Sequence, residues 1–275
     1  MNTDNEARTP IIDNKHYNES SVFRPENLLR EARRQMDKPN CEVPDICVLD
    51  PDGDLVDYLK ERRRAERSDC WACYHSELYT FEHEGRTLGI LPCVVGAPYA
   101  TIVAEQLFAS GCELIISVTS AGIVNEDHVI RRFALLTEAV RDEGTSYHYL
   151  PPDRKAKLNE KLYRQITTGS RPDDDTRYFE AKSWTTDAPY RETQSAIEAM
   201  KARGVSCVEM EAAALYTVAE KTGNHIVCFA HLTNTMAQDE GDFEKGEHFG
   251  SIDTLELISE VLKSLQVDLS QSQPY

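Results

Sequence analysis

The sequence predicts an α/β fold: a single three-layer domain in which helices flank a central mixed, largely parallel sheet. From residue 46 onwards, short apolar runs that are typical of buried strands alternate with segments of helical periodicity. No internal repeat and no long linker separates these units. The length of 275 residues fits one large α/β domain or two small ones, and it can bury a sizeable core.

The two ends of the chain are expected to lie outside this domain. The start is polar, and Pro25–Lys38 has the pattern of a charged amphipathic helix with Leu28, Leu29 and Ala32 on one face. We therefore expect four segments: residues 1–20 disordered, residues 21–45 as an N-terminal helical extension, residues 46–269 as the α/β domain and residues 270–275 as a flexible tail.

Strands are expected where apolar or alternating residues lie between turn-forming residues. In chain order they are Ile46–Leu49, Leu78–Phe81, Arg86–Val95, Leu114–Val118, Phe133–Val140, Ala181–Thr186, Ser206–Val208 and His225–Leu232. The second and third form a hairpin that turns at Glu84 and Gly85. Helices are expected between the strands, at Leu55–Arg67, Tyr99–Ser110, Leu158–Thr167, Gln194–Ala202, Glu211–Thr222 and Ser251–Leu265.

The charge of the chain excludes several classes of partner. The formal net charge is −17 at pH 7, whereas nucleic acids and acidic membranes are bound by clustered Lys and Arg. The longest basic run, residues 62–64, lies between acidic residues and is expected to be a solvated helix face. No apolar stretch approaches the roughly 20 residues of a membrane span, and residues 1–14 lack the hydrophobic core of a signal peptide. We expect a cytoplasmic protein without nucleic-acid or membrane partners.

The eight cysteines are spread over the chain, and several, such as Cys47, Cys93 and Cys228, lie in strand-like runs. This usage is typical of buried, reduced thiols and not of a secreted disulfide framework. Cys70 and Cys73 have the spacing of metal ligands, but no second pair accompanies them. Neither a metal site nor a redox motif is therefore expected.

Small and polar residues gather at the ends of six expected strands, and in largely parallel sheets ligands bind at the carboxyl ends. These ends are Asp50–Asp54, Gly96–Pro98, Thr119–Gly122, Thr185–Tyr190, Glu209–Glu211 and Thr233–Thr235. Their composition favours a small-molecule site over a purely structural role.

The segment Gly204–Tyr216 places two carboxylates and a methionine in an otherwise apolar run that continues into an alanine-rich helix. Burying Glu209 and Glu211 costs free energy unless hydrogen-bond donors compensate. The two hydroxyls of a ribose are suitable donors, because one carboxylate can accept from both. The alternative is an exposed strand end whose glutamates face water, and the motif alone does not decide between them.

Residues 47–265 resemble the nucleoside phosphorylase superfamily, in the branch that holds uridine phosphorylase, hexameric purine nucleoside phosphorylase and the methylthioadenosine nucleosidases. The most specific match is Val208–Ala214. The resemblance implies that Glu211 binds the ribose hydroxyls, that Met210 packs on the sugar and that Glu209 lies beside the ribose. It also implies a homo-oligomer, at least a dimer, without cofactor or metal.

Other segments match in the same order along the chain. Residues 95–98 resemble the family's strand break, which includes Gly96, and residues 117–122 resemble the segment below the sugar and the nucleophile, which includes Ser120 and Gly122. Together these segments strengthen the resemblance and imply that all three residues bind substrate.

The resemblance also extends to residues 141–146 and 185–190. The second of these segments forms part of the base pocket in the family, which implies a place there for Thr186. Trp184 and Tyr190 become candidates for stacking on the base. The alternative is that both are core aromatics that touch no ligand.

The chain departs from the family at the phosphate site. Phosphorylases of the family hold phosphate with arginines, which are the strong way to bind that anion. Their positions here carry Gly53, Ser117 and, for an arginine lent by a neighbouring subunit, a residue near Tyr74. Of the usual phosphate ligands only Ser120 remains.

The turn after the first strand carries carboxylates instead. In the nucleosidase branch a carboxylate on this turn activates water, so Asp52 or Asp54 can serve as general base, and hydrolysis is slightly favoured. Phosphorolysis, with inorganic phosphate as co-substrate, is the alternative if Arg131, Arg132 or a partner-chain arginine holds the phosphate.

Asn234 occupies the position at which bacterial purine enzymes of the family carry an aspartic acid. An amide can donate to a 6-oxo group and accept from a ring N–H, but it cannot supply an acidic proton. This favours a 6-oxopurine or a pyrimidine over adenine as the leaving base. His231 and His148 are further titratable candidates, with a structural role as the alternative.

The expected function is cleavage of the N-glycosidic bond of a nucleoside, with Glu211, Asn234, Asp52 and Asp54 as catalytic residues. An alternative from another class is a nucleoside-binding protein that has lost its nucleophile site. The missing arginines support this alternative, and the intact ribose motif opposes it.

Overall fold

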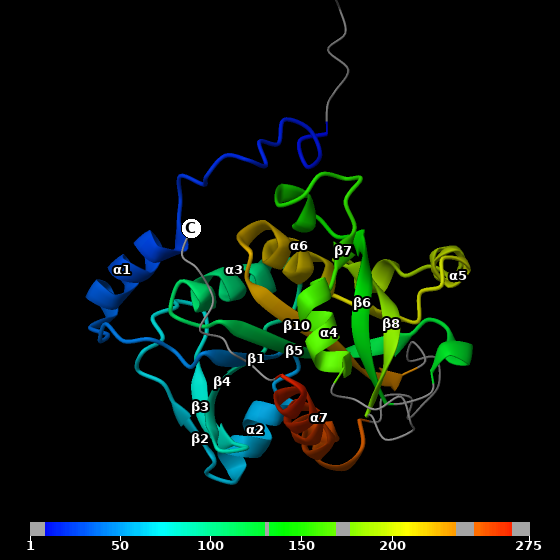
Figure 1. Ribbon diagram of the computed structural model, residues 1–275. Coiled ribbons are helices and arrows are strands. Elements are labelled where there is room, and N and C mark those ends of the chain that lie inside the picture. Colours follow the sequence, from blue (N-terminus) through cyan, green and yellow to red (C-terminus); the bar gives the residue numbers. More distant parts are fainter. Residues whose placement is uncertain (1–8, 130–131, 169–176, 235–244, 266–275) are drawn as a thin grey trace, which may run out of the picture.

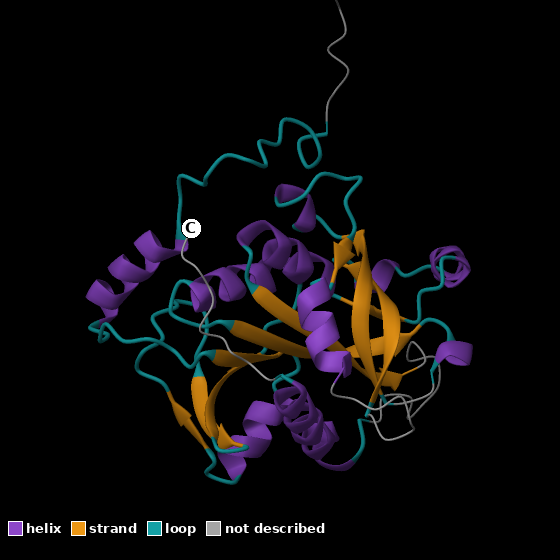
Figure 2. Cartoon of the chain, viewed as in Figure 1, coloured by secondary structure: helices purple, strands orange, loops and turns teal. Residues whose placement is uncertain are grey.

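The computed structural model describes residues 9–129, 132–168, 177–234 and 245–265. In these ranges a large mixed sheet runs through the centre, and helices cover both of its faces (Figures 1 and 2). The predicted α/β fold with a central sheet between helical layers is confirmed.

The strands are β1 (Ile46–Asp50), β2 (Ala65–Arg67), β3 (Tyr79–His83), β4 (Arg86–Pro92), β5 (Leu114–Ile123), β6 (Phe133–Asp142), β7 (Ala156–Lys157), β8 (Tyr178–Thr186), β9 (Cys207–Glu209) and β10 (His225–Asn234). The helices are α1 (Pro25–Met36), α2 (Asp54–Glu61), α3 (Ala97–Phe108), α4 (Glu160–Thr168), α5 (Gln194–Ala202), α6 (Ala212–Thr222) and α7 (Ser251–Ser264). Four short 3₁₀ helices in the described ranges are η1 (Glu126–His128), η2 (Ser146–His148), η3 (Pro189–Arg191) and η4 (Glu247–Gly250).

The strand order is β10-β6-β8-β9-β5-β1-β4-β3-β2, with β7 beside β6. The neighbours β4, β1, β5 and β10 are parallel, whereas β2, β3 and β4 form antiparallel pairs. Because β10 pairs with β5 as well as with β6, the strands β5, β10, β6, β8 and β9 close into a small barrel. The sheet is therefore mixed, as predicted, with a parallel part at its centre.

Helices form the outer layers. α3 packs against α6 above the sheet in Figure 1, and α2 packs against α7 below it. The α6 residues from Ala212 to Ala219 are all buried. The large one among them, Tyr216, satisfies its hydroxyl by donating to the carbonyl of Leu136 and accepting from the N–H of Cys228 at 3.1 Å. No helix in the described ranges is long and apolar enough to cross a membrane.

The predicted helix Leu55–Arg67 is wrong in its second half. α2 ends at Glu61, Arg63 takes a left-handed conformation with φ of 55°, and the chain returns as β2 beside β3. The buried face of α2 ends at Leu59, whose carbonyl accepts from the N–H of Arg64 at 2.8 Å. A longer helix would gain no buried apolar face to support it.

Several predicted strand ends also differ, and two of these differences lie near the predicted site residues. β4 ends at Pro92 and not at Val95, because Cys93 has a left-handed φ of 58°. β5 continues to Ile123, because β9 and β10 pair with its last residues. Thr119–Gly122 therefore lies within a strand and not in a loop after it.

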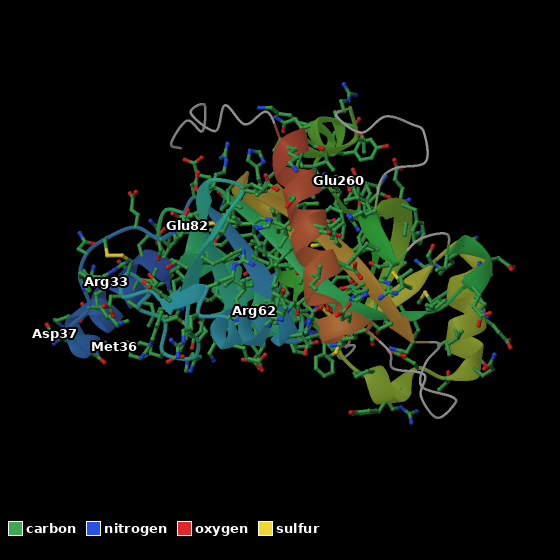
Figure 3. The ribbon with its side chains drawn as sticks, turned by 90° about the horizontal axis from the view of Figure 1, so that it is seen from below. Arg33, Met36, Asp37, Arg62, Glu82 and Glu260 are labelled. Atoms are coloured by element: carbon green, nitrogen blue, oxygen red, sulfur yellow. A yellow bond between two sulfur atoms is a disulfide. The ribbon has the colours of Figure 1, made fainter. Side chains whose placement is uncertain are left out.

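The N-terminal helix is confirmed as α1, which packs on α3 at the edge of the molecule (Figure 3). Leu29 and Ala32 are buried against Ala72, whereas Leu28 is only half-buried. Met36 and Asp37 mark the outer end of the helix in Figure 3. The boundaries of the four predicted segments stay predictions, and the tail lies outside the described residues.

The expectation of reduced thiols throughout is wrong. A disulfide joins Cys41, which precedes β1, to Cys70 in the connection between β2 and β3. Lys38 and Asp69 link the same two segments by an ion pair of 2.9 Å. Cys93 also departs from the expectation, because it is exposed. The two cysteines are 29 positions apart in the sequence. Their spacing alone does not reveal that they form a disulfide.

Candidate active site

The carboxyl ends of three parallel strands, β1, β5 and β10, lie side by side at one edge of the sheet. Ser120 of β5 is level with His231 of β10, and Gly122 is level with Asn234. β9 reaches the same edge, since Val208 pairs with Gly122. The turn after β1, the ends of β5 and β10 and the start of α6 therefore converge, and they carry most of the predicted site residues.

Glu211 is buried at the start of α6. Its Oε1 accepts from the N–H of Gly96 at 2.7 Å, and its Oε2 accepts from the N–H of the half-buried Met210 at 3.3 Å. Gly96 precedes α3 with a φ of 90°, a conformation that favours glycine. The carboxyl group thus lies where the N-termini of two helices meet, an arrangement that favours an anion.

Glu209 and Glu211 are both buried, and the charge of one disfavours the charge of the other. Burial and then the charge of Glu209 raise the pKa of Glu211 to about 8, although hydrogen bonds from Gly96 and Thr119 act in the opposite direction. At neutral pH the carboxyl group of Glu211 is therefore mostly protonated. A positive charge that develops beside it would favour the ionised form.

Glu209 accepts hydrogen bonds from two backbone N–H groups and two hydroxyls. Its Oε2 accepts from the N–H groups of Glu211 and Ala212, both at 2.7 Å, and its Oε1 accepts from the hydroxyls of Ser183 and Thr185. The carboxylate caps α6 and ties it to β8. The two hydroxyls stand two positions apart on a buried strand, so they share a face, and this spacing was the available clue in the sequence. The place of Glu209 beside a ribose remains a prediction.

A lysine with no recognisable motif joins the predicted aspartates. Lys245 Nζ lies 2.6 Å from Asp54 Oδ2 and 3.2 Å from Asp52 Oδ2, and the lysine side chain is only 11% exposed. Ser120 donates to Asp52 from its N–H at 3.2 Å and from its hydroxyl at 2.9 Å. Burial acts to lower the pKa of Lys245, but the hydrogen bond to Asp54 and the charges of both aspartates outweigh it and raise that pKa.

Asp50 is buried beneath this turn, at the end of β1. Its Oδ2 accepts from the N–H of Val56 at 2.9 Å in the first turns of α2. Burial raises the pKa of Asp50 to about 7; the hydrogen bond from Val56 opposes the rise, and the charges of Asp52 and Asp54 add to it. The turn therefore sets two carboxylates against one ammonium group, with the buried Asp50 carboxyl group beneath them, and this arrangement disfavours a further anion.

Asn234 is buried at the end of β10, and its Nδ2 donates to Thr233 Oγ1 at 3.1 Å. The ring of His231 stacks on Phe133 with a centroid distance of 4.6 Å. Burial and then the charge of Arg132 lower the pKa of His231 to about 4. Its ring is therefore neutral at physiological pH, which favours the structural alternative for this histidine.

The remaining cationic and histidine candidates have other surroundings. Arg132 donates to the carbonyl of Lys245 at 3.1 Å and lies 3.5 Å from Asp253, so it braces the segment that carries the lysine. His148 lies on η2, beyond the opposite end of β6, and bonds to the N-terminal segment. Arg131 lies outside the described residues.

The two aromatic candidates for base stacking have different surroundings, and a place for either beside a base remains a prediction. Trp184 is buried in a cluster with Val140 and Ile197, and its Nε1 donates to Asp142 at 2.9 Å. It is a core aromatic, because the packing of α5 covers it. Tyr190 is 99% exposed on η3, so it is neither a core residue nor enclosed in a pocket.

Two other segments of the resemblance are held by internal contacts. Thr186 is buried, and its hydroxyl accepts from the N–H of Ala188 at 3.1 Å. Arg141 donates to the carbonyls of Leu150 and Pro151, both at 2.7 Å. Both side chains stabilise their own loops, and the place of Thr186 in a base pocket remains a prediction.

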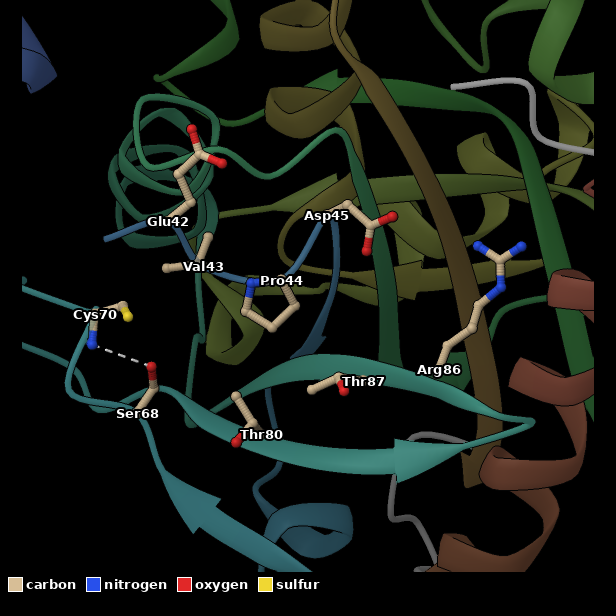
Figure 4. A pocket seen from close by; sticks show the side chains of 9 residues that line it. All are labelled: Glu42, Val43, Pro44, Asp45, Ser68, Cys70, Thr80, Arg86 and Thr87. Atoms are coloured by element: carbon tan, nitrogen blue, oxygen red, sulfur yellow. Dashed lines mark hydrogen bonds between the residues drawn. The ribbon is translucent and has the colours of Figure 1, made fainter. Parts of the chain in front are cut away.

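A cavity of about 470 Å³ lies beside the disulfide, and none of the residues that line it is a predicted site residue (Figure 4). Asp45 and Arg86 both line it, and the N–H of Cys70 donates there to Ser68 Oγ at 3.3 Å. Among the described residues, no group of three or more His, Cys, Asp or Glu side chains is arranged to hold a metal ion.

Comparison with known proteins identifies a family. Residues 41–263 match the model of the phosphorylase superfamily. A DeoD-type purine nucleoside phosphorylase of Hahella chejuensis is 26% identical over 167 residues, which are 59% of this chain and 69% of that protein. A guanosine phosphorylase of Halorubrum lacusprofundi is 25% identical over 183 residues, which are 66% of this chain and 75% of that protein.

Solved structures share the fold. A uridine phosphorylase from Vibrio fischeri, complexed with 6-hydroxy-1-naphthoic acid, has a TM-score of 0.67 at 21% identity and covers 83% of this chain and 93% of its own. A purine nucleoside phosphorylase from Toxoplasma gondii, in complex with immucillin-H, has a TM-score of 0.66 at 14% identity and covers 85% of this chain and 94% of its own. At these identities the likeness concerns the fold alone.

Proposed function

Because the chain belongs to the phosphorylase superfamily, we propose that it cleaves the N-glycosidic bond of a nucleoside with water as the attacking nucleophile. The observation that carries the choice of water is the turn after β1. There Asp52 and Asp54 share the ammonium group of Lys245, and Asp52 also accepts both donors of Ser120.

Glu211 and Met210 hold the sugar in this proposal. The Glu211 carboxyl group can exchange hydrogen bonds with two ribose hydroxyls in either protonation state. As the glycosidic bond stretches, the sugar gains positive charge, and the ionised carboxylate stabilises that charge more than it stabilises the neutral substrate. Gly96 keeps the carboxyl group in place through its N–H.

Asn234 faces the leaving base in the proposal, and Gly122 lies level with it on the neighbouring strand. The amide can donate to a 6-oxo group and accept from a ring N–H, so a 6-oxopurine or a pyrimidine nucleoside is the proposed substrate. The name of the guanosine phosphorylase among the relatives is in line with a 6-oxopurine.

Water attacks the anomeric carbon in the proposed reaction while the bond to the base nitrogen breaks. The proton of the water passes to Asp52, and the electron pair of the broken bond leaves with the base, which takes a proton from solvent. Lys245 and Ser120 orient the carboxylate. The products are the free base and ribose, and no cofactor takes part.

Phosphorolysis is the second candidate, because the relatives named above are phosphorylases, which use phosphate as co-substrate. Arg132 donates to the backbone carbonyl of Lys245. Among the described residues it is the arginine that would bind the phosphate in this second candidate. This candidate requires phosphate to bind against the carboxylates of the turn.

One assay tests both candidates. Inosine, guanosine, uridine and adenosine are incubated with the protein, with and without inorganic phosphate, and free base, ribose and ribose 1-phosphate are measured. The proposal predicts base and ribose at a rate that phosphate does not change. Ribose 1-phosphate would establish phosphorolysis instead, and saturable binding without release of base would indicate a nucleoside-binding protein.

The homo-oligomer implied by the resemblance belongs to this proposal as well. We expect at least a dimer, which light scattering after size-exclusion chromatography measures directly. A monomer at working concentration would contradict it.

A further inference from the structure

We propose that Ser120 and Lys245 form an oxyanion site that the carboxylate of Asp52 occupies, and that this internal anion keeps phosphate out. The inference rests on the proposed hydrolysis only for its role in catalysis. The site itself follows from the contacts of the described residues.

The donors converge on one carboxylate. The N–H of Ser120 reaches Asp52 Oδ2 at 3.2 Å, the Ser120 hydroxyl reaches Oδ1 at 2.9 Å, and Lys245 Nζ reaches Oδ2 at 3.2 Å. A backbone N–H, a hydroxyl and an ammonium group around two oxygens are the donors that phosphate or sulfate would need. Asp52 therefore stands where an external oxyanion would find its hydrogen bonds.

The site is built and not a chance surface contact. The Lys245 side chain is largely buried, and its backbone carbonyl is held by the Arg132 guanidinium. Gly246, the next residue, has a φ of 88°, a conformation that favours glycine, and it lies against the end of the Arg132 guanidinium. The backbone that carries Lys245 is thus held in a conformation that other residues rarely adopt.

The surrounding charges keep the site closed. Asp54 also pairs with Lys245, Asp50 lies beneath the turn, and Arg132 is shared with Asp253. The neutral His231 adds no positive charge. An entering phosphate would have to displace Asp52 and lie next to it and to Asp54, at a high electrostatic cost.

Removing the internal anion should open the site. The Asp52→Ala variant frees Ser120 and one side of Lys245, so inorganic phosphate should bind to it at least about tenfold more tightly than to the wild type. Isothermal titration of the full chain with inorganic phosphate measures this. In Asp52→Ala combined with Lys245→Met the gain should disappear.

Two variants make the outcome decisive. Asp57→Ala removes an exposed aspartate from the first turn of α2, where its partner is Lys60, and should leave phosphate binding as in the wild type. Asp52→Asn keeps the shape of the side chain and removes its charge, so it should gain phosphate affinity even if the alanine variant fails to fold.

Each result decides one question. Tight phosphate binding by the wild type, or no gain in either folded Asp52 variant, would overturn the inference. Because the titration needs no turnover, the inference survives if the wild type proves inactive on every nucleoside, whereas the proposed hydrolysis does not. If ribose 1-phosphate appears with an Asp52 variant but not with the wild type, the result supports both the internal oxyanion and the proposed hydrolysis by the wild type.

Discussion

At the scale of single residues, the carboxyl groups of the site differ in the hydrogen-bond and ion-pair partners that surround them. Glu209 accepts four internal hydrogen bonds, Glu211 meets two backbone N–H groups, and Asp52 shares Lys245 with Asp54. One functional group thus serves as a helix cap, as the proposed sugar ligand and as the proposed base. The environment, and not the residue type, sets these roles.

The raised pKa of Glu211 predicts a pH dependence. Below about pH 8 the protonated form predominates, and the proposed transition state needs the ionised form, so kcat/KM should rise with pH and level off above about 8. In Glu211→Gln this rising limb of the pH profile should vanish, and kcat should fall by roughly 100-fold or more. The pH profile of nucleoside cleavage tests this. The exposed Glu198→Gln serves as the control and should keep the wild-type profile, whereas an intact limb in Glu211→Gln would refute the assignment.

Asn234 predicts a change of base selectivity. A carboxyl group in its place can accept from a 6-amino group, so Asn234→Asp should raise the ratio of kcat/KM for adenosine to that for inosine by about tenfold or more. Steady-state kinetics on both nucleosides measure the ratio. Asn27→Asp, on the exposed face of α1, is the matched control. A variant that stays active with an unchanged ratio would remove Asn234 from the base pocket.

At the scale of secondary-structure elements, the starts of three helices carry the site. Glu209 caps α6, Glu211 meets the N–H of Gly96 before α3, and Asp50 meets the N–H of Val56 in α2. Carboxyl groups satisfy N–H groups that a helix leaves unpaired at its first turn. Each of these three carboxyl groups is therefore positioned by the start of a helix that packs on the core.

The cap at α6 predicts a loss of stability. In Glu209→Gln one acceptor oxygen becomes an NH₂ group that faces donors, so the free energy of unfolding should fall by about 2–4 kcal/mol. Urea denaturation at neutral pH provides the value. Glu61→Gln, exposed at the end of α2, should change it by less than about 0.5 kcal/mol. Equal stability of the two variants would show that the buried contacts of Glu209 do not support the fold.

At the scale of the whole molecule, local patterns predicted which polar residues follow the strands, whereas contacts between distant segments determined the exact strand ends and the remaining contacts of the site. The turn at Asp52 follows an apolar strand directly, so its place at the sheet edge was visible in the sequence. Lys245 was not, since its partner Asp54 is 191 positions away. The burial of Trp184 was not visible in the sequence either, because the helix that covers it comes later in the chain. The family resemblance predicted which residues hold the sugar, whereas the charge balance of the turn after β1 required coordinates.

The disulfide between Cys41, before β1, and Cys70, between β2 and β3, is expected to stabilise the folded chain. The Cys41–Cys70 disulfide closes a loop of about 30 residues, so Cys41→Ser should lower the free energy of unfolding by about 3–4 kcal/mol through the entropy of the unfolded chain. Cys93→Ser changes an unpaired, exposed thiol and is the matched control. Denaturation without reductant should separate the two variants, and with reductant the wild type should approach Cys41→Ser. Because α1 also packs through Leu29 and Ala32, the variant should still fold; equal stability of all three proteins without reductant would show that the bond does not stabilise the chain.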